Sequence, residues 1–313
     1  MQQLTNRFLL KAENTGQNQW WMYVLGIFSA ITGYLTFLLI IRNPLYEKAH
    51  ANGISNSQIL KDPNILFNPN KMEINKNIMF ILLMLFFVFT LFFFVLAIKF
   101  IHKKTLASVI TSFENIRWNR YFFAFTLWGS LIILLTVVSY LVSPQDMEIH
   151  FDFSKFIVLL VVAIIFVPIQ TATEEIIFRG YLMQGLGLAF KSGIVSLIIT
   201  SVLFGLLHLS NPEAKAHGWL LMLPYYSCFG MFLAMLTLLD EGLELAMGIH
   251  CANNLISSLL VTSKNSVLQT DAIFYTSVEN PAGEFLMWIA MAALCFFVFY
   301  KKYKLTNFKL LIR

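Results

Sequence analysis

Charged side chains are scarce in this chain of 313 residues. Asp, Glu, Lys and Arg make up 12% of the sequence, whereas 58% of the residues are hydrophobic. Soluble globular domains carry about 25% charged residues, so the composition excludes an ordinary soluble domain. Together with a mean hydropathy of +0.70, it predicts a polytopic membrane protein in contact with the lipid bilayer.

Cysteine is also rare. Cys228, Cys251 and Cys295 all lie in apolar runs and show no paired spacing, which argues against a disulfide framework and against a cysteine zinc site. The net charge of +5 does not indicate a nucleic-acid partner, because the Lys and Arg residues fall mostly in connections and tails. There they report membrane topology and contact with anionic lipid.

Eight apolar segments are predicted to span the membrane. The fourth begins at residues 156–172, contains Pro168, and can continue as a helix to Phe190. The predicted spans are 20–41, 78–98, 121–142, 156–190, 193–207, 219–239, 245–261 and 285–300. The connection 42–76 contains three prolines and is predicted to be a loop with at most short helices. The predicted fold is therefore all-α, a polytopic transmembrane helix bundle.

We predict three parts along the chain. Residues 1–150 form an N-terminal transmembrane region with three spans, residues 151–264 a catalytic core with four, and residues 265–313 a C-terminal span with a basic tail. With Arg179 assigned to the connection after the fourth span, the side of both termini carries 14 Lys and Arg residues and the opposite side 8. Positive charge favours the cytoplasmic side, so both termini are predicted to be cytoplasmic. The richness in Asn, Lys and Ile indicates an A+T-rich bacterial genome, and hence a bacterial cytoplasmic membrane.

Two carboxylates and an arginine lie inside the fourth apolar run. Glu174, Glu175 and Arg179 are the only charged side chains between residues 156 and 190, and charges at membrane depth are costly and usually functional. If the chain turns at residues 191–192 and returns as an antiparallel helix, Glu174 and His208 both lie about 24 to 26 Å from the turn. They are therefore level with each other.

His250 and Asn254 add a third helix to this site. They are four residues apart on the seventh span, so both project from one face. Peptide hydrolysis needs a base that activates water and donors that bind the oxyanion. Glu174 suits the base, with His208 sharing the water, while His250 and Asn254 suit the oxyanion. Glu175 and Arg179, at i and i+4, are predicted to form an ion pair that supports the helix.

These motifs resemble the signature of a known family. The pattern Glu174-Glu175-x-x-x-Arg179, Phe204-x-x-x-His208 and His250-x-x-x-Asn254 is similar to that of the CAAX-processing and bacteriocin-processing (CPBP, Abi-like) intramembrane proteases, the type II CAAX prenyl endopeptidases and their bacterial relatives. The resemblance implies an intramembrane endopeptidase in which the first Glu and first motif His activate water, and the last His and Asn bind the oxyanion. It implies a peptide or membrane-protein substrate, which in a bacterium need not be a prenylated protein.

A metalloprotease is the alternative mechanism within this resemblance. Glu174, His208 and His250 would then be the ligands of a zinc ion with one open position. The sequence lacks the His-Glu-x-x-His spacing of soluble zinc proteases. We therefore favour a glutamate-dependent reaction that requires no cofactor.

Three other functions stay open from the sequence. A bacteriocin-immunity or maturation factor belongs to the same family, and a non-catalytic membrane scaffold would share the fold. A proton-coupled transporter would use the same buried charges, Glu174, Glu175 and Arg179. The sequence shows no inverted repeat and no pair of broken helices, which argues against transport.

Overall fold

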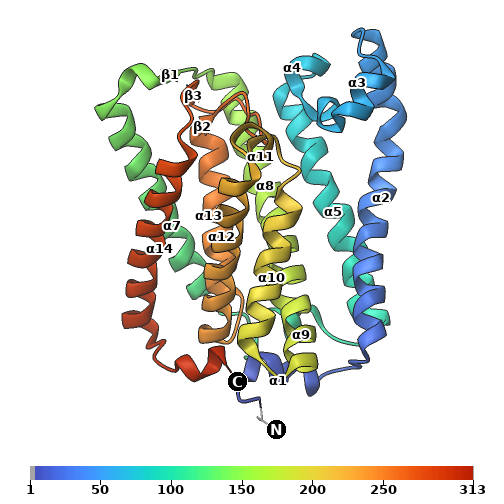
Figure 1. The fold of residues 1–313 in the computed structure, drawn as a ribbon, viewed down its shortest axis with the longest axis vertical. Helices are drawn as coiled ribbons and strands as arrows, with labels where there is room; N and C mark the ends of the chain where they lie inside the picture. Colours follow the sequence, from blue (N-terminus) through green and yellow to red (C-terminus); the bar gives the residue numbers. More distant parts are fainter. Residues whose placement is uncertain (1–3, 313) are drawn as a thin grey trace.

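The main feature of the computed structural model, which describes residues 4–312, is a bundle of long helices that run along one axis (Figure 1). The long helices are α2 (Trp20–Ala51), α5 (Lys76–Phe100), α7 (Trp118–Val142), α8 (Phe153–Glu175), which continues through a π-helical segment (Ile176–Leu182) into α9 (Met183–Phe190), α10 (Gly193–His208), α12 (Trp219–Asp240), α13 (Glu244–Leu260) and α14 (Pro281–Tyr303). Every apolar segment predicted to span the membrane is helical, apart from Val261 at the end of the seventh, which begins a short strand. The prediction of an all-α polytopic bundle is confirmed.

The helices differ in whether they can cross a bilayer. Within residues 4–312, six helices are long and apolar enough, counting α8 to α9 as one. The helix α10 has 16 residues and α13 has 17, which gives lengths of about 24 to 26 Å, less than the roughly 30 Å hydrocarbon core. The helix α10 packs against α12, and α13 packs against α7 and α8. The number of eight full crossings stays a prediction.

Short elements gather at the two ends of the bundle. The short helices are α1 (Arg7–Glu13), α3 (Asn56–Lys61), α4 (Pro69–Met72), α6 (Leu106–Ile110) and α11 (Pro212–His217), with 3-10 turns at Pro63–Phe67, Pro144–Asp146 and Phe308–Leu311. Three short strands, β1 (Met147–Ile149), β2 (Val261–Thr262) and β3 (Phe274–Thr276), form a sheet in the order β1-β3-β2, in which β1 is antiparallel and β2 parallel to β3. Figure 1 shows both chain ends at one end of the bundle, and α3, α4, α11 and the strands at the other.

The first long helix extends further than the sequence predicted. It was expected to end at Ile41, but it continues through Arg42 and Pro44 to Ala51. Its last turns bury Leu45 and Ala49 in an apolar cluster that also contains residues of α3 and α5. Because these two side chains are four apart, they lie on one face of the helix, and their burial explains why the helix persists beyond the apolar run.

The fourth apolar run behaves as predicted. Its helix continues through the carboxylates to Phe190, and the chain turns at Lys191, which has a left-handed backbone conformation, and at Ser192, whose side chain caps α10. The π-helical segment just after Glu175 is an addition that the sequence did not predict. Segments of this kind are rare and are often found at functional sites.

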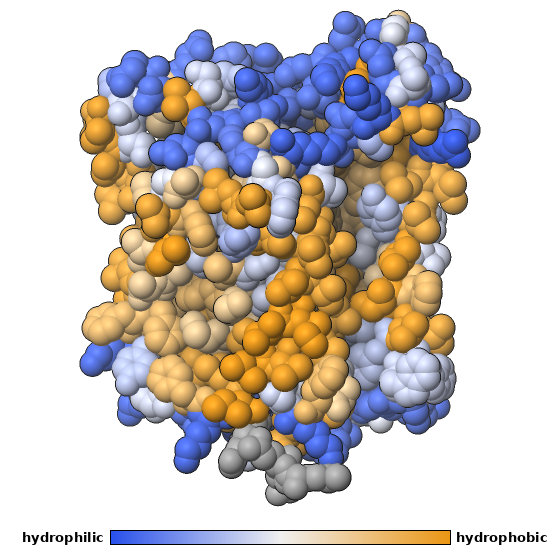
Figure 2. Space-filling view, in the orientation of Figure 1, coloured by the Kyte–Doolittle hydropathy of each residue, from blue (hydrophilic) through white to orange (hydrophobic). Residues whose placement is uncertain are grey.

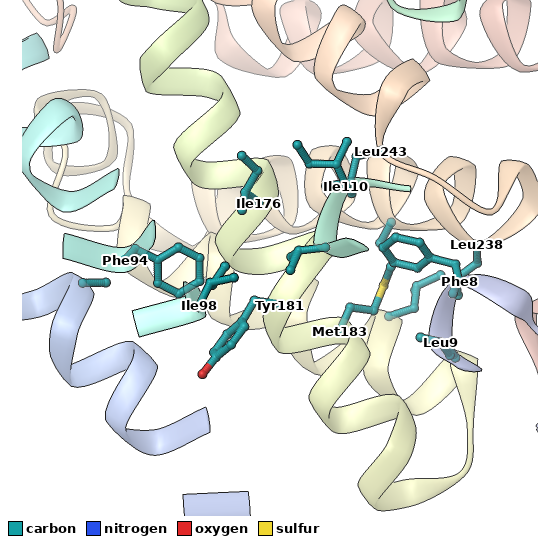
Figure 3. Packing of buried hydrophobic residues seen from close by; sticks show 14 of the residues in the cluster. Phe8, Leu9, Phe94, Ile98, Ile110, Ile176, Tyr181, Met183, Leu238 and Leu243 are labelled. Atoms are coloured by element: carbon teal, nitrogen blue, oxygen red, sulfur yellow. The ribbon is translucent and has the colours of Figure 1, made fainter. Parts of the chain in front are cut away.

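Apolar packing holds the π-helical segment in place. Figure 3 shows Ile176, Tyr181 and Met183 among side chains from α1, α5, α6 and α12, all in one buried cluster. A Cβ atom added at Gly180 would lie 2.8 Å from the backbone oxygen of Val109, so only glycine allows α6 to approach this closely. The backbone that follows Glu175 is therefore fixed from several sides.

The surface has an apolar band below a hydrophilic cap. Figure 2 shows hydrophilic residues over the end that carries α3, α4 and α11, and a broad hydrophobic band below it. Helices from all three predicted parts pack in one bundle: α7 on α13, α5 on α8, and α14 on α12. The division into residues 1–150, 151–264 and 265–313 stays a prediction.

Candidate active site

Glu175 is the centre of a buried charged cluster. Its Oε1 atom accepts a hydrogen bond from Arg179 Nη1 at 2.8 Å and lies 2.7 Å from His250 Nδ1. The side chains of Glu175 and Arg179 have no exposed surface. The ion pair predicted from the i, i+4 spacing is thus present, and the contact with His250 joins α8 to α13.

Glu174 lies on the other side of the same imidazole. Its Oε2 atom is 3.4 Å from His250 Nε2, and 14% of its side chain is exposed, so Glu174 is the more accessible of the two carboxylates. The Nδ2 atom of Asn254 is also 3.4 Å from His250 Nε2. Glu174, His250 and Asn254 therefore converge on one point, as the sequence predicted for a hydrolytic site.

His208 approaches this point from the end of α10. Its Nδ1 atom lies 2.7 Å from the carbonyl oxygen of Phe204, and its ring lies 4.2 Å from the Phe204 ring. The guanidinium carbon of Arg179 is 4.1 Å from the centre of that same ring, and the ring of His250 is 6.1 Å from it. Phe204 is fully buried, and it packs between the three polar side chains.

The tautomer of His208 follows from its partner. A carbonyl oxygen can only accept a hydrogen bond, so Nδ1 must carry a proton. In the neutral ring, Nε2 is then the acceptor. His208 forms no hydrogen bond or ion pair with Glu174 among the described residues.

Comparison with known proteins places this site in a family. Residues 153–256 match the model of the type II CAAX prenyl endopeptidase Rce1-like family, and this range contains every predicted site residue. The chain therefore contains an Rce1-like domain. It is also similar to the uncharacterised protein YyaK of Bacillus subtilis (strain 168), with 34% identity over 198 residues, which are 63% of this chain and 66% of YyaK. No solved structure gives a significant match.

The structure corrects one prediction about the Rce1-like site. Arg179 was counted with the connection after the fourth span, but it lies inside the bundle and is fully buried. Room for it is made by Gly230 of α12, where a Cβ atom would lie 2.9 Å from Arg179 Nη2. Without Arg179, the side of the termini still carries more Lys and Arg residues than the opposite side.

Three contacts of the Rce1-like site were missed from the sequence. Glu175 contacts His250 as well as Arg179, the Nδ2 atom of Asn254 donates to Gln170 Oε1 at 3.0 Å, and Asn253 contacts Asn254 at 3.1 Å. A spacing signal for Gln170 was available, since it lies four residues before Glu174 on the same helical face.

The zinc alternative fits the described side chains poorly. Between residues 4 and 312, no group of three or more His, Cys, Asp or Glu side chains is arranged to hold a metal ion. Glu174 and His250 form an ion pair, whereas His208 forms no hydrogen bond or ion pair with either of them among the described residues. A structural or catalytic zinc needs at least three protein ligands, so we derive no step through a metal.

A polar cleft opens beside the Rce1-like site, at the hydrophilic end of the bundle. Its volume is about 610 Å³, and its walls come from residues 62–71, 210–216 and 264–269. Ser210 and Asn211 in one wall lie two and three residues after His208, and the backbone N–H of Asn211 donates to the carbonyl oxygen of His208 at 3.1 Å. The cleft is thus continuous along the chain with one side of the site.

Proposed function

We propose that this protein is an intramembrane endopeptidase that hydrolyses a peptide bond in a membrane-associated protein or peptide. The observation that carries the proposal is the convergence of Glu174, His250 and Asn254 on one point, in a chain that contains an Rce1-like domain. The family supports the reaction class, and the partly accessible carboxylate of Glu174 suits the role of general base.

Glu174 and His208 suit the activation of water. Glu174 is partly accessible, and its Oε2 atom has no hydrogen-bond partner among the described residues. A water molecule between Glu174 and His208 can give one proton to the carboxylate while its other hydrogen stays on the oxygen and donates a hydrogen bond to Nε2 of His208. The resulting hydroxide attacks the scissile carbonyl carbon, and Glu174 then passes the proton to the leaving amine.

His250 and Asn254 suit the binding of the oxyanion. The Glu175 carboxylate is an acceptor, so the Nδ1 atom of His250 carries a proton. When the ring carries a second proton, its Nε2 atom is a donor as well. Nε2 of His250 and Nδ2 of Asn254, only 3.4 Å apart, can then donate to the same oxyanion. Removal of one such donor typically slows a reaction about 100- to 1,000-fold.

The experiment compares wild type with Glu174→Ala, both purified in detergent, on a quenched fluorescent peptide library. We expect cleavage by wild type and a loss of at least about 100-fold in the variant, because a general base typically contributes 10²- to 10⁴-fold. The control is Glu148→Ala in the exposed strand β1, which should leave cleavage unchanged. Full activity in folded Glu174→Ala would overturn the mechanism.

The same samples test the metal question. The metal content of active wild type is measured by mass spectrometry, and cleavage is repeated after incubation with a chelator. On the glutamate-dependent reaction, activity persists without stoichiometric zinc. Stoichiometric zinc together with loss of cleavage on chelation would support the zinc alternative, with Glu174, His208 and His250 rearranged around the ion.

We also propose a location and an orientation. The relative in Bacillus subtilis supports a bacterial cytoplasmic membrane, and the excess of Lys and Arg at the end with both termini supports a cytoplasmic position for that end. The polar cleft would then face outward. In intact cells, a membrane-impermeant thiol reagent should label Ser57→Cys in α3 but not Lys309→Cys near the carboxyl end; the reverse pattern would invert the topology.

A further inference from the structure

A chain of amide groups leads from the membrane core to Asn254. The Nε1 atom of Trp128 in α7 donates to Asn253 Oδ1 at 3.2 Å, Asn253 Nδ2 donates to Asn254 Oδ1 at 3.1 Å, and Asn254 Nδ2 donates to Gln170 Oε1 at 3.0 Å. Trp128 is fully buried, and Gln170 is nearly so. We call these four residues the amide chain.

Trp128 gives the amide chain its direction. An indole N–H is a donor only, whereas an asparagine amide can present either its oxygen or its nitrogen to a neighbour. Beside Trp128, Asn253 must therefore present Oδ1, which leaves Nδ2 to face Asn254. Asn254 must accept this hydrogen bond with Oδ1, so its own Nδ2 points away from Asn253, toward Gln170 and His250.

The direction matters for the proposed reaction. Only the Nδ2 side of Asn254 can donate to an oxyanion, and an amide turned by 180° would present an acceptor and repel the negative charge. We propose that Trp128 and Asn253 are positioning residues that hold the Asn254 amide with its N–H groups toward the reacting carbonyl. This inference rests on the proposed endopeptidase function and adds a second layer of residues to it.

A matched pair of tryptophans tests the source of the direction. Trp128→Phe removes the donor and frees the amides to turn, and we expect kcat to fall about fivefold, which corresponds to the loss of one hydrogen bond. Trp288, whose ring lies 6.5 Å from that of Trp128, is also buried, but its Nε1 atom has no partner among the described residues. Trp288→Phe should leave kcat within about twofold of wild type, since it breaks no hydrogen bond.

Reversal of the hydrogen-bond direction in the amide chain should lower kcat further. In Asn253→Asp, a carboxylate presents oxygen on both sides, so Asn254 must turn its Nδ2 toward residue 253 and its Oδ1 toward the site. We expect kcat to fall about 100-fold, with KM within about twofold. The affinity for a peptidyl difluoroketone, whose hydrate mimics the tetrahedral intermediate, should fall in parallel with kcat. The affinity for substrate should not.

The outcomes separate this inference from the proposed function. If wild type cleaves no peptide, the endopeptidase proposal itself fails. If wild type cleaves and Trp128→Phe matches Trp288→Phe, or if Asn253→Asp lowers only the unfolding temperature and raises KM, the amide chain has a structural role alone and the inference is wrong. A graded loss of kcat in the order Trp288→Phe, Trp128→Phe, Asn253→Asp supports it.

A second inference comes from the charges of the polar cleft. Three lysines and one aspartate line it. Lys215 Nζ lies 2.7 Å from Asp62 Oδ1, whereas Lys71 and Lys264 form no ion pair within the described chain. Two positive charges are therefore unmatched in a cleft whose other lining side chains are mostly amides and hydroxyls.

We infer that the cleft binds an acidic segment of the substrate, on the side of the scissile bond that lies outside the membrane. Carboxylates complement the two free lysines. Asn68 also lines the cleft, and because its Oδ1 atom accepts from the backbone N–H of Lys71, its Nδ2 group is left to donate to a substrate carboxylate. The wall formed by Ser210 and Asn211 begins two residues after His208, so a peptide bound at the site can continue directly into the cleft. This inference also rests on the proposed function.

Charge reversal tests the cleft. Two peptides that differ only in Glu or Gln residues on one flank of the cleaved bond are compared at low salt. Wild type should prefer the Glu peptide in kcat/KM by about three- to tenfold, as expected for two exposed ion pairs, and the preference should shrink at high salt. Lys71→Glu combined with Lys264→Glu should reverse it.

The control carries the same charge change outside the cleft. Lys61→Glu combined with Lys155→Glu, at two exposed lysines that do not line it, should keep the wild-type preference. Equal cleavage of both peptides by wild type would overturn the inference. A second outcome would also overturn it. If the Lys71→Glu and Lys264→Glu variant kept the preference for the Glu peptide, but its cleavage rate no longer responded to added vesicles of phosphatidylglycerol as that of wild type does, the two lysines would bind lipid headgroups and not the substrate.

Discussion

Two clusters of charge lie at different heights in this bundle, and they differ in how their charges are matched. At the end with the termini, Arg7, Arg117 and Arg120 face Asp240, Glu241 and Glu244. Three positive and three negative groups balance, and Arg117 donates hydrogen bonds to Glu244 from both Nε and Nη2. Such a matched set positions the start of α13, and each of its carboxylates pairs with an arginine. Within the described chain, two of its buried atoms, Asp240 Oδ2 and Arg117 Nη1, have no hydrogen-bond partner.

The cluster at the candidate active site is unbalanced. Two carboxylates, Glu174 and Glu175, share one guanidinium, and the imidazole of His250 lies between them. Its polar atoms include four that are buried and have no hydrogen-bond partner among residues 4–312, namely Glu174 Oε2, Glu175 Oε2, Arg179 Nε and Arg179 Nη2. Uncompensated polar groups are costly in a stable fold, and their presence here favours a chemical role over a purely structural one.

The same substitution, Glu to Gln, made in each cluster tests most directly whether the two clusters differ in function. In Glu175→Gln, His250 loses the charged acceptor that holds its Nδ1 atom, and we expect kcat to fall about 10- to 100-fold, as for other residues that support a functional histidine. In Glu244→Gln, Arg117 keeps Asp240 as a partner, so kcat should stay within twofold while the unfolding temperature falls. Both enzymes are measured below their unfolding temperatures.

The opposite pattern would erase the distinction between the clusters. If Glu175→Gln kept the kcat of wild type and only lowered the yield of folded protein, Glu175 would be an ion-pair partner of Arg179 alone, as the i, i+4 spacing predicted. If Glu244→Gln lowered kcat as strongly, the two clusters would be coupled along α13.

The sequence predicted what depends on helical period and chain direction. The hairpin through residues 191–192 brings Glu174 level with His208, because residues per turn and rise per residue are nearly constant. The face shared by His250 and Asn254, and the pair Glu175 and Arg179, follow from the same regularity. These parts of the fold and of the site were predictable from spacing alone.

Contacts between helices could not be predicted in this way. The side chain of Glu175 contacts α13 as well as Arg179, and Trp128 of α7 reaches Asn253, because helices far apart in sequence pack side by side. Helix ends were uncertain for a similar reason: α2 runs past Pro44 because Leu45 and Ala49 find apolar partners in α3 and α5. Tertiary burial decides such details, and the residue pattern of one segment does not show which other helix that segment packs against.

A carboxylate outside both clusters sharpens the comparison with a smaller effect. Glu213 in α11, outside the long helices, accepts a hydrogen bond from the backbone N–H of Val267 at 2.7 Å, but it pairs with no Lys or Arg within the described chain. Burial raises the pKa of Glu213. A raised pKa means that the ionised form is disfavoured in the fold, so the stability it contributes is present at low pH and is lost as the pH rises through the folded pKa.

Glu213→Gln should therefore stabilise the protein at pH 7, by about 1 to 2 °C in unfolding temperature, and the gain should vanish below about pH 4, where the unfolded glutamate is also protonated. Asp62 gives the opposite sign, since its hydrogen bond with Lys215 lowers the pKa of Asp62: Asp62→Asn should be neutral at low pH and slightly destabilising at pH 7. Unfolding curves in detergent across this pH range measure both. A Glu213→Gln variant that is less stable than wild type at pH 7 would mean that Glu213 is held ionised by a partner, as in the matched cluster.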